Sequence, residues 1–383
     1  MSRKIIEMFE NRFHHAPAVA AAAPGRLEIL GNHTDYNEGF VLSTAVGQTT
    51  DVAMSPIEGR ECIIHENGKD YTLSLDEIDV YVPGDWRNYL KGLLVELRKR
   101  GHEVKAFEAA LTSTVPLSAG MSSSAALEMA FAYALKEING IELSLPDWAR
   151  VGQGVENNFM GLKSGLLDQF SSLYGQANAL IHCDFRTVEV LQTVSMPAGW
   201  KLVVANTLVK HNLVESDYNL RRQSCENACA AIQKTNPEVK ALRDVSPALL
   251  EQCRNAMDPV DYSRALHVVG ENDRVMRGVE ILKAGDVEGF GKLLFESHES
   301  SRVNFENSCP ELDALVELAH TIPGCAGARL SGGGFGGISI HLVKEDQAQQ
   351  YCERLETAYE SMTGKKINTI ICSIGDGAKI ITR

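Results

Sequence analysis

The sequence predicts an α+β protein of two lobes, with strands concentrated in the first part of the chain and helices in the second. Up to about residue 115, apolar and polar residues alternate as they do in half-buried strands, whereas residues 218–320 repeat apolar residues at helical spacing. The composition changes near residue 180, and a length of 383 residues suits two or three domains. We therefore predict a first lobe over residues 1–180 and a second over residues 181–383.

The first lobe begins with a predicted amphipathic helix, because Ile5, Phe9 and Phe13 recur at helical spacing between charged residues. Gly59 and Gly68 lie in turns between alternating segments, and Gly101 closes a further helix. The pattern predicts strands over 49–54, 61–65, 70–75 and 104–112, helices over 85–100, 146–160 and 167–174, and a long alanine-rich helix after the serines 122–124.

The second lobe is predicted to be mostly helical between two groups of strands. Glycine and proline residues interrupt the helical stretch, and no internal repeat or low-complexity segment stands out. The predicted elements are strands over 179–192 and 200–208, helices within 218–320, strands over 326–331 and 337–343, a helix over 345–361 and a strand over 367–374.

The charge of the chain argues against two classes of function. Thirty-seven Lys and Arg residues and 50 Asp and Glu residues give a formal net charge of −13 and a pI of about 5.4. An acidic chain is a poor candidate for binding nucleic acid or an anionic membrane surface. No apolar run approaches the roughly 18 residues of a membrane helix, since the alanine-rich stretch 16–23 ends at Pro24. We expect neither nucleic acid nor membrane as a partner, and no obligate protein partner is evident.

The cysteines and the N-terminus predict a cytoplasmic protein. Nine cysteines are scattered along the chain without a Cys-x-x-Cys pair. Cys225 and Cys229 lie four residues apart in a predicted helix, and two thiols alone rarely hold a metal, so we interpret them as buried or incidental thiols. The first residues, MSRKIIEMFENRF, read as a helix with interleaved charges and not as a signal peptide.

The segment PLSAGMSSSAA, residues 116–126, combines a glycine-containing loop with three serines that open a helix. A helix N-terminus offers unpaired N–H groups and the positive end of a dipole, which suit a phosphate group, and serine hydroxyls add donors and a possible Mg²⁺ ligand. The alternative is ordinary helix capping, for which one serine would suffice. The segment is not a Walker P-loop, because it lacks Gly-Lys-Ser/Thr.

The segment GARLSGGGFGG, residues 327–337, has five glycines in six positions, interrupted by Phe335. A simple hairpin turn needs one or two glycines. Five glycines indicate that the backbone closely approaches a ligand or another loop, although a mobile hairpin remains the alternative.

The segment 24–39 places polar residues beside a short apolar stretch. Arg26, Glu28, His33, Asp35 and Tyr36 offer the donors and acceptors that a sugar requires, unless the segment is merely a solvated turn.

Two carboxylates, Glu156 and Asp168, flank a loop further along. Asp168 stands in the first turn of a predicted helix beside Leu166 and Leu167, where it either caps the helix or, in a partly apolar site, acts as a general base.

These segments together resemble the galactokinase branch of the GHMP kinases. PGRLEILGNHTDY (24–36) resembles the galactokinase signature, PLSAGMSSSAA the family's phosphate loop and GARLSGGGFGG its third motif. Further similar segments span roughly residues 20 to 340 in the expected order, at 85–92, 206–222, 265–275 and 297–313. The resemblance implies a two-lobed fold with a mixed sheet and a left-handed βαβ phosphate-loop unit in the first lobe, an α+β second lobe and an active site in the cleft.

The resemblance also implies an activity, the phosphorylation of the anomeric hydroxyl of D-galactose by ATP with Mg²⁺. By position, Asp168 matches the catalytic aspartate and Arg26 the arginine that keeps it ionised. The other implied residues are Glu28, Asn32, His33, Asp35, Gly165 and Tyr218 for the sugar, Gly120, Met121, Ser122, Ser123, Ser124 and Trp86 for ATP, and Ser124 and Glu156 for Mg²⁺.

Five positions depart from the family pattern, one of them Asn157, which replaces a frequent His beside Glu156. Asn32 stands where the family usually has Glu, and Glu28 where it usually has Asn. If 27–30 is a strand, Arg26 and Glu28 share one face, so Glu28 would brace Arg26 while Asn32 adjusts the pocket to another sugar. The alternative is neutral drift with galactose retained. Lys163 and Ser164 replace a common Pro and Cys, and we expect Lys163 to face solvent.

Other functions remain open at this stage. The acceptor could instead be N-acetylgalactosamine, another hexose or a uronic acid. A non-catalytic sugar and ATP sensor is disfavoured, because such relatives lack a Ser-Ala pair that is present here within residues 122–126. A kinase for mevalonate or homoserine is disfavoured by the His-Thr-Asp-Tyr turn and the segment around Tyr218.

Overall fold

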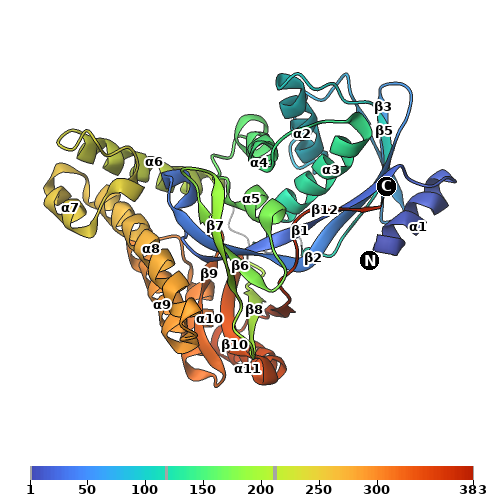
Figure 1. Cartoon of the computed structure of the whole chain (residues 1–383). Helices are drawn as coiled ribbons and strands as arrows, with labels where there is room; N and C mark the ends of the chain where they lie inside the picture. Colours follow the sequence, from blue (N-terminus) through green and yellow to red (C-terminus); the bar gives the residue numbers. More distant parts are fainter. Residues whose placement is uncertain (1, 117–119, 210–213, 383) are drawn as a thin grey trace.

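The computed structural model describes residues 2–116, 120–209 and 214–382, and it has two lobes, each built on a sheet (Figure 1). The first-lobe elements are α1 (Ser2–Phe13), β1 (Val19–Leu30), η1 (Asp35–Asn37), β2 (Phe40–Pro56), β3 (Glu61–Glu66), β4 (Lys69–Ser74), α2 (Arg87–Lys99), β5 (Phe107–Ser113), α3 (Ser123–Asn139), α4 (Leu145–Gly154), η2 (Val155–Met160), α5 (Leu167–Tyr174), β6 (Ala179–Asp184), β7 (Glu189–Ser195) and β12 (Lys379–Thr382). The second-lobe elements are β8 (Trp200–Asn206), α6 (Val214–Gln233), η3 (Leu242–Asp244), α7 (Pro247–Gln252), η4 (Arg254–Ala256), α8 (Pro259–Lys283), α9 (Val287–Ser300), η5 (Ser301–Phe305), α10 (Pro310–Thr321), β9 (Cys325–Ser331), β10 (Ile338–Lys344), η6 (Glu345–Gln347), α11 (Ala348–Thr363) and β11 (Asn368–Cys372).

The sheet of the first lobe is mixed and has eight strands. Its main order is β12-β1-β2-β5-β3-β4, and β6 extends it by pairing with β2 and β7. The pair β3–β5 is parallel, and the other pairs are antiparallel. The 17-residue β2 pairs with β1, β5 and β6 along different parts of its length, so one long strand joins both ends of the sheet.

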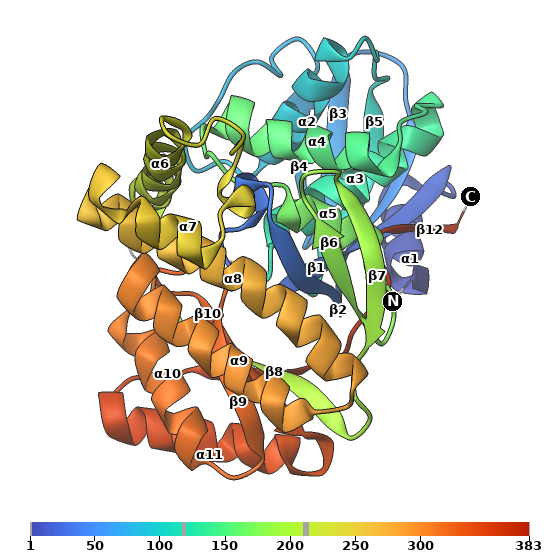
Figure 2. The same cartoon turned by 60° about the vertical axis from the view of Figure 1, so that its left-hand side comes forward.

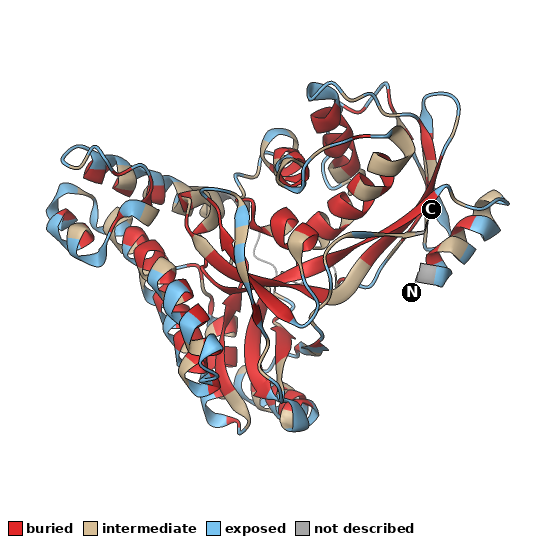
Figure 3. Ribbon diagram, viewed as in Figure 1, coloured by how far each residue is buried: buried red, intermediate tan, exposed pale blue. Residues whose placement is uncertain are grey.

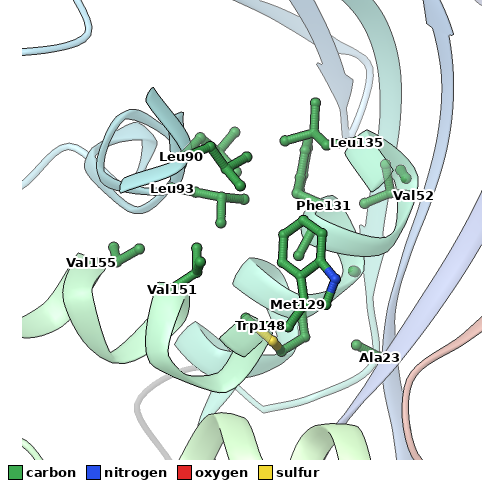
Figure 4. Close-up of a cluster of buried hydrophobic side chains, with 14 of the residues drawn as sticks. Ala23, Val52, Leu90, Leu93, Met129, Phe131, Leu135, Trp148, Val151 and Val155 are labelled. Atoms are coloured by element: carbon green, nitrogen blue, oxygen red, sulfur yellow. The ribbon is translucent and has the colours of Figure 1, made fainter. Parts of the chain in front are cut away.

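Helices α2, α3 and α4 enclose the apolar core of the first lobe against this sheet (Figure 4). Trp148 of α4 and Phe131 of α3 are among its largest buried side chains. Leucines of α2, such as Leu93, close it from the far side, while Ala23 and Val52 contribute from β1 and β2. Burying one such side chain stabilises the fold by about 1.5–3 kcal/mol, so this core fixes the helix α3 that begins at the serines.

The sheet of the second lobe has four antiparallel strands in the order β11-β8-β10-β9, of which Figure 2 labels β8, β9 and β10. These three strands are largely buried, whereas the edge strand β11 is partly exposed. Consecutive residues of β8 point to opposite faces. Val203 packs with Tyr351 and Leu355 of α11, whereas Val204 packs in the cluster that contains Phe290 of α9.

The two lobes share that second cluster. It joins Leu27 and Leu30 of β1 to Val275 and Val279 of α8 and Ile340 of β10. β1 is buried along all twelve residues (Figure 3). The predicted division between residues 180 and 181 falls within β6, whose sheet continues through β7 and also takes in β12 from the other end of the chain.

Most predicted elements are confirmed, and the differences have physical reasons. The alanine-rich residues before Pro24 form part of β1, because an internal strand tolerates alanine where neighbouring helices press close. The segment 179–192, predicted as one strand, is a hairpin that turns between Asp184 and Glu189. The predicted helix 146–160 contains α4 and then the π-helical turn η2. Among the residues that the structure describes, no helix combines the length and apolar character needed to span a membrane.

Candidate active site

A cavity of about 580 Å³ lies between the lobes. Its walls come from the end of β1 and the turn after it, the start of α3, the loop from η2 to α5, helix α6 and the glycine-rich turn between β9 and β10. The predicted site residues that line it are Arg26, Glu28, Asn32, His33, Asp35, Ser124, Glu156, Gly165, Asp168 and Tyr218. Residues distant in sequence therefore meet in one concave site.

Arg26 and Asp168 form a two-pronged ion pair on one wall. Nε and Nη2 of Arg26 donate to the two carboxylate oxygens of Asp168, at 2.8 Å each. Nη1 donates to the Gly120 carbonyl at 2.6 Å, and the Ser122 hydroxyl donates to the Asp168 carboxylate. The Arg26 side chain is 6% exposed and that of Asp168 is 27% exposed, so the carboxylate is the accessible member of the pair.

The phosphate-loop segment closes around this ion pair, although its residues 117–119 lie outside the described part of the chain. The Met121 carbonyl accepts a hydrogen bond from the Arg26 backbone N–H at 3.0 Å, while the Met121 side chain is buried in the shared core. Ser122 precedes α3 with φ +52° and its side chain makes no capping bond. The capping interpretation therefore fails for Ser122, whose hydroxyl is directed to Asp168 instead.

Ser124 and Glu156 approach each other beside the same helix start. The Ser124 hydroxyl lies 3.4 Å from Oε1 of Glu156, and Ser164 donates to Oε2. Burial, reinforced by the nearby negative charge of Asp168, raises the pKa of Glu156 to about 7. The protein's own groups therefore do not fully compensate the negative charge of the Glu156 carboxylate.

The turn after β1 presents His33 and Asp35 to the cavity. Burial lowers the pKa of His33 to about 3, so the ring is neutral at pH 7. Nε2–H then donates to the Gly333 carbonyl at 3.2 Å, and Nδ1 accepts from the Tyr36 hydroxyl at 2.7 Å. The Tyr218 ring lies 5.0 Å from the His33 ring, centroid to centroid.

Asp35 packs directly against Gly165. A Cβ at Gly165 would lie 1.6 Å from Oδ2 of Asp35, so no larger residue fits there. The same carboxylate accepts from the Leu167 N–H at 3.2 Å, which ties the turn after β1 to the helix that carries Asp168. Burial raises the pKa of Asp35.

Glu28 and Asn32 are joined by a hydrogen bond. Nδ2 of Asn32 donates to Oε1 of Glu28 at 2.9 Å and to the Gly332 carbonyl at 2.8 Å, while Oδ1 accepts from Asn307 at 2.9 Å. Arg329 donates to the same oxygen of Glu28 at 3.0 Å. Glu28 therefore pairs with Arg329, and the expected brace of Arg26 is limited to a charge effect that raises the pKa of Arg26 against burial.

The glycine-rich turn fits closely against its surroundings, as its composition predicted. A Cβ at Gly334 would lie 2.1 Å from the Asn307 carbonyl, and a Cβ at Gly332 would lie 3.5 Å from the Gly120 carbonyl. Both glycines have positive φ, +83° and +84°. The turn thus brings backbone of the second lobe against the phosphate-loop segment.

Of the residues predicted for ATP, only Ser124 lines the cavity; Gly120, Met121, Ser122, Ser123 and Trp86 do not. Trp86 contacts Tyr71, with ring centroids 5.4 Å apart, and does not line the cavity. Ser123 begins α3 without lining the cavity. Lys163 is exposed, as predicted.

Sequence reasoning missed a buried layer behind the cavity, formed by His267, Glu271, Asn307 and Arg329. All four belong to segments that resemble the family, 265–275, 297–313 and 327–337, which was the available signal. Their partners lie 235 to 301 residues away in sequence, so no local pattern pairs them.

Comparisons with known proteins agree with this geometry. Residues 7–56 match the model of the galactokinase galactose-binding signature, residues 88–176 that of the GHMP kinases N terminal domain and residues 279–361 that of the GHMP kinases C terminal domain. A galactokinase from Roseiflexus sp. (strain RS-1) is 36% identical over 97% of this chain and 95% of its own length. A galactokinase from Actinobacillus pleuropneumoniae serotype 3 is 37% identical over 98% of each chain.

Solved structures show the same relationship. The structure of Lactococcus lactis galactokinase complexed with galactose matches with a TM-score of 0.93 and 30% identity, covering 98% of both chains. Mevalonate kinase of Methanococcus jannaschii, at 19% identity and a TM-score of 0.63 over 93% of this chain and 98% of its own, shares the fold. The predicted two-lobed fold is confirmed, and the chain belongs to the galactokinase family of GHMP kinases.

Proposed function

We propose that this protein transfers the γ-phosphoryl group of ATP to the anomeric hydroxyl of D-galactose, giving galactose 1-phosphate and ADP. The observation that carries the proposal is the ion pair of Arg26 and Asp168, set in the cavity between the sugar-side turn and the start of α3. The galactose complex of the Lactococcus lactis relative, similar over nearly the whole chain, supports the choice of sugar.

In this proposal Asp168 accepts the hydrogen bond of the sugar hydroxyl that attacks the phosphoryl group. Arg26 holds both carboxylate oxygens, so it fixes their direction and places a positive charge beside them. Phosphoryl transfer depends mainly on alignment and on neutralising charge, and both tasks suit a clamped carboxylate beside a guanidinium. The Ser122 hydroxyl donates a hydrogen bond to Asp168, and Ser122 immediately precedes α3.

The start of α3 supplies the proposed phosphate site, with backbone N–H groups, the helix dipole and the hydroxyls of Ser122, Ser123 and Ser124. Ser124 and Glu156 fit a magnesium ion, because both offer hard oxygen ligands and lie 3.4 Å apart. The raised pKa of Glu156 marks a carboxylate that a cation would stabilise. Bound Mg²⁺ would neutralise phosphate charge.

The pair of Glu28 and Asn32 supports galactose over a respecified sugar. The two residues exchange places relative to the family pattern, yet they are hydrogen-bonded to each other, so the wall still offers one carboxylate and one amide. Both N–H groups of the Asn32 amide are already donated within the protein. Glu28 is therefore the member of the pair that we assign to the sugar.

A double exchange, Glu28→Asn with Asn32→Glu, tests this assignment. If the pair merely swaps roles, the exchange restores the family arrangement and the order of preference among sugars stays the same. A changed order would show that the pair respecifies the pocket.

The proposed activity is tested by ADP release from Mg-ATP across a panel of sugars: galactose, 2-deoxygalactose, N-acetylgalactosamine, galacturonate, glucose, arabinose and fucose. Galactose should lead the panel. Another sugar in the lead would replace galactose as the substrate, and no turnover with any sugar would favour the sensor.

We further propose that the protein works in the cytoplasm. All nine cysteines are free thiols, and most are buried, which suits a reducing compartment. Labelling of the cell fractions with an antibody against the chain tests this location, and recovery outside the cytoplasmic fraction would contradict it.

A further inference from the structure

One face of α8, in the second lobe, holds the backbone of the turn that carries the sugar-side residues. Oε2 of Glu271 accepts the backbone N–H groups of Gly31 and Asn32, at 2.9 and 3.0 Å. His267, one helical turn earlier, lies 3.1 Å from the Asn32 carbonyl. Asn272 accepts the N–H of Phe40 at 2.9 Å, where the turn rejoins β2.

These contacts stabilise the turn after β1, which contains residues with positive φ. Gly31 has φ +99°, and His33 has φ +61°, a conformation that costs a non-glycine residue about 1–2 kcal/mol. Two consecutive N–H groups that point to one carboxylate oxygen fix the peptide planes on either side of Gly31, and His267 contacts the carbonyl of the next plane, between Asn32 and His33. The position of the His33 ring, and with it the hydrogen bond to Gly333, depends on those planes.

Glu271 is fully buried and its acceptors are all used. Oε2 takes the two backbone N–H groups, and Oε1 takes Nε of Arg274. Burial alone would raise the pKa of Glu271, but the positive charges around it, that of Arg274 first, and the hydrogen bond from Arg274 together hold the pKa below its ordinary value. His267 is held in turn by the Ser300 hydroxyl at 3.0 Å.

We propose that Glu271 is a positioning residue for sugar binding, which acts through the backbone of Gly31 and Asn32 and not by touching the sugar. This inference rests on the proposed sugar-kinase activity and adds a residue from the second lobe that sets the shape of the sugar-side wall. It separates the two substrates, because Glu271 contacts the sugar-side turn and none of its hydrogen bonds reaches the phosphate-loop segment.

The sharpest test compares two double variants that both remove the buried ion pair. In Glu271→Gln with Arg274→Met, the amide oxygen still accepts the two N–H groups, and no guanidinium opposes the amide N–H₂. In Glu271→Met with Arg274→Met, the side chain has nearly the same length but no comparable acceptor. The two proteins differ chiefly in the hydrogen bonds at issue, and both avoid an unpaired buried charge.

We expect the KM for galactose to be about tenfold higher or more in the Met double variant than in the Gln double variant, the factor expected when buried donors lose their acceptor. The KM for ATP should agree within about twofold. Equal values for galactose, or equal rises for both substrates, would overturn the proposal, because a general loss of structure would affect both sites.

The single variant Glu271→Gln sharpens the result. In this variant the amide N–H₂ must face either the Arg274 guanidinium or the two backbone N–H groups, and all of these are donors. The variant should therefore bind galactose more weakly than the Gln double variant, in which Arg274 is replaced by Met. The reverse order would count against the proposal. Glu280→Gln, the same chemical change at an exposed site on the same helix, is the matched control.

A wrong assignment of the sugar-kinase activity is distinguished from a wrong role for Glu271 by assaying the wild-type protein. The wild-type protein is first assayed with the sugar panel, and the variants are compared on the sugar it uses best. A wild type that does not phosphorylate galactose contradicts the proposed substrate. If no sugar turns over, calorimetric binding of galactose without ATP still ranks the two double variants.

Discussion

The sugar-side wall and the phosphate side of the cavity are built in opposite ways. On the sugar side, the Asn32 amide and the His33 ring have protein partners on each polar atom, and those partners come from both lobes. On the proposed phosphate side, the hydrogen-bond partners of Glu156 within the described part of the chain are hydroxyl and amide groups, and burial, with the charge of Asp168 nearby, raises the pKa of Glu156 to about 7. On the proposed assignment, the difference teaches that the sugar-side wall is set by hydrogen bonds within the protein, whereas the phosphate side would be completed by the charge of its ligands.

The largest expected effect comes from Asp168→Asn on the phosphate side. The amide keeps the size of the side chain but can no longer take a proton, so kcat should fall by about 10³-fold, within the range for a lost general base. Galactose binding, measured by calorimetry, should change by less than about threefold, because the sugar-side wall keeps its partners. A variant that turns over at the wild-type rate would refute the assignment of Asp168.

The glycine-rich turn, which touches both sides, should give the next effect. Gly334→Ala adds a Cβ 2.1 Å from the Asn307 carbonyl, whereas Gly337→Ala at a similar φ meets nothing within 4 Å. Positive φ alone should cost the Gly337 variant about 1 kcal/mol, and the overlap should raise the cost for the Gly334 variant to about 3 kcal/mol. Urea unfolding measures both, and equal values would show that the close approach is unimportant.

Lowering the pH should reduce the stability of the protein through two buried histidines, His267 behind the cavity and His341 in the sheet of the second lobe. Burial lowers the pKa of His267 to about 4 and that of His341 to about 3. The unfolded chain takes up their protons near pH 6.5, so each contributes a stability that is present above pH 6.5 and is lost as the pH falls, about 2 kcal/mol at pH 5.

Replacing either histidine by Asn should therefore reduce the loss of stability between pH 7 and pH 5 by about 2 kcal/mol relative to wild type, as measured by urea unfolding at each pH. Only the His267 variant should also raise the KM for galactose, since His341 bonds Ser339 and Tyr351 inside the second sheet. The same loss of stability in wild type and variant would contradict neutral burial of that histidine.

The smallest effect is expected at Lys163, which lies between the two sides. Its side chain is exposed, so Lys163→Ala should leave kcat and both KM values within about twofold. A clear loss of ATP binding alone would place the lysine charge on the phosphate side instead.

The sequence was sufficient for what depends on local chemistry. Three local patterns each predicted part of the site: the serines after a glycine loop, the glycine-rich turn and the polar end of a strand. Residues from all three segments line the cavity. Glu271, Asn307 and Arg329 were missed because each has partners in the other lobe. A charged residue such as Glu271 in a helix is expected at the surface until its buried partner is known. Trp86 was assigned to ATP by resemblance, and in the structure it contacts Tyr71.

Secondary structure that depends on pairing between distant strands was also hard to predict from the sequence. The alanines of β1 carry no strong strand preference, and only pairing with β2 and β12 makes them a strand. The short β12 was not predicted, since four residues near the C-terminus give too little pattern. The predicted boundary at residue 180 followed a change in composition, whereas sheet pairing crosses that point.

The return of β12 to the first sheet has a mechanical consequence. The chain crosses from one lobe to the other after β7 and crosses back between β11 and β12, so two covalent links, and not one, connect the lobes. A body joined to another at two points can rotate only about the line through them. The shared core around Leu30 and Val279 resists even that rotation. The two links and the shared core therefore restrict the relative movement of the lobes on either side of the cavity.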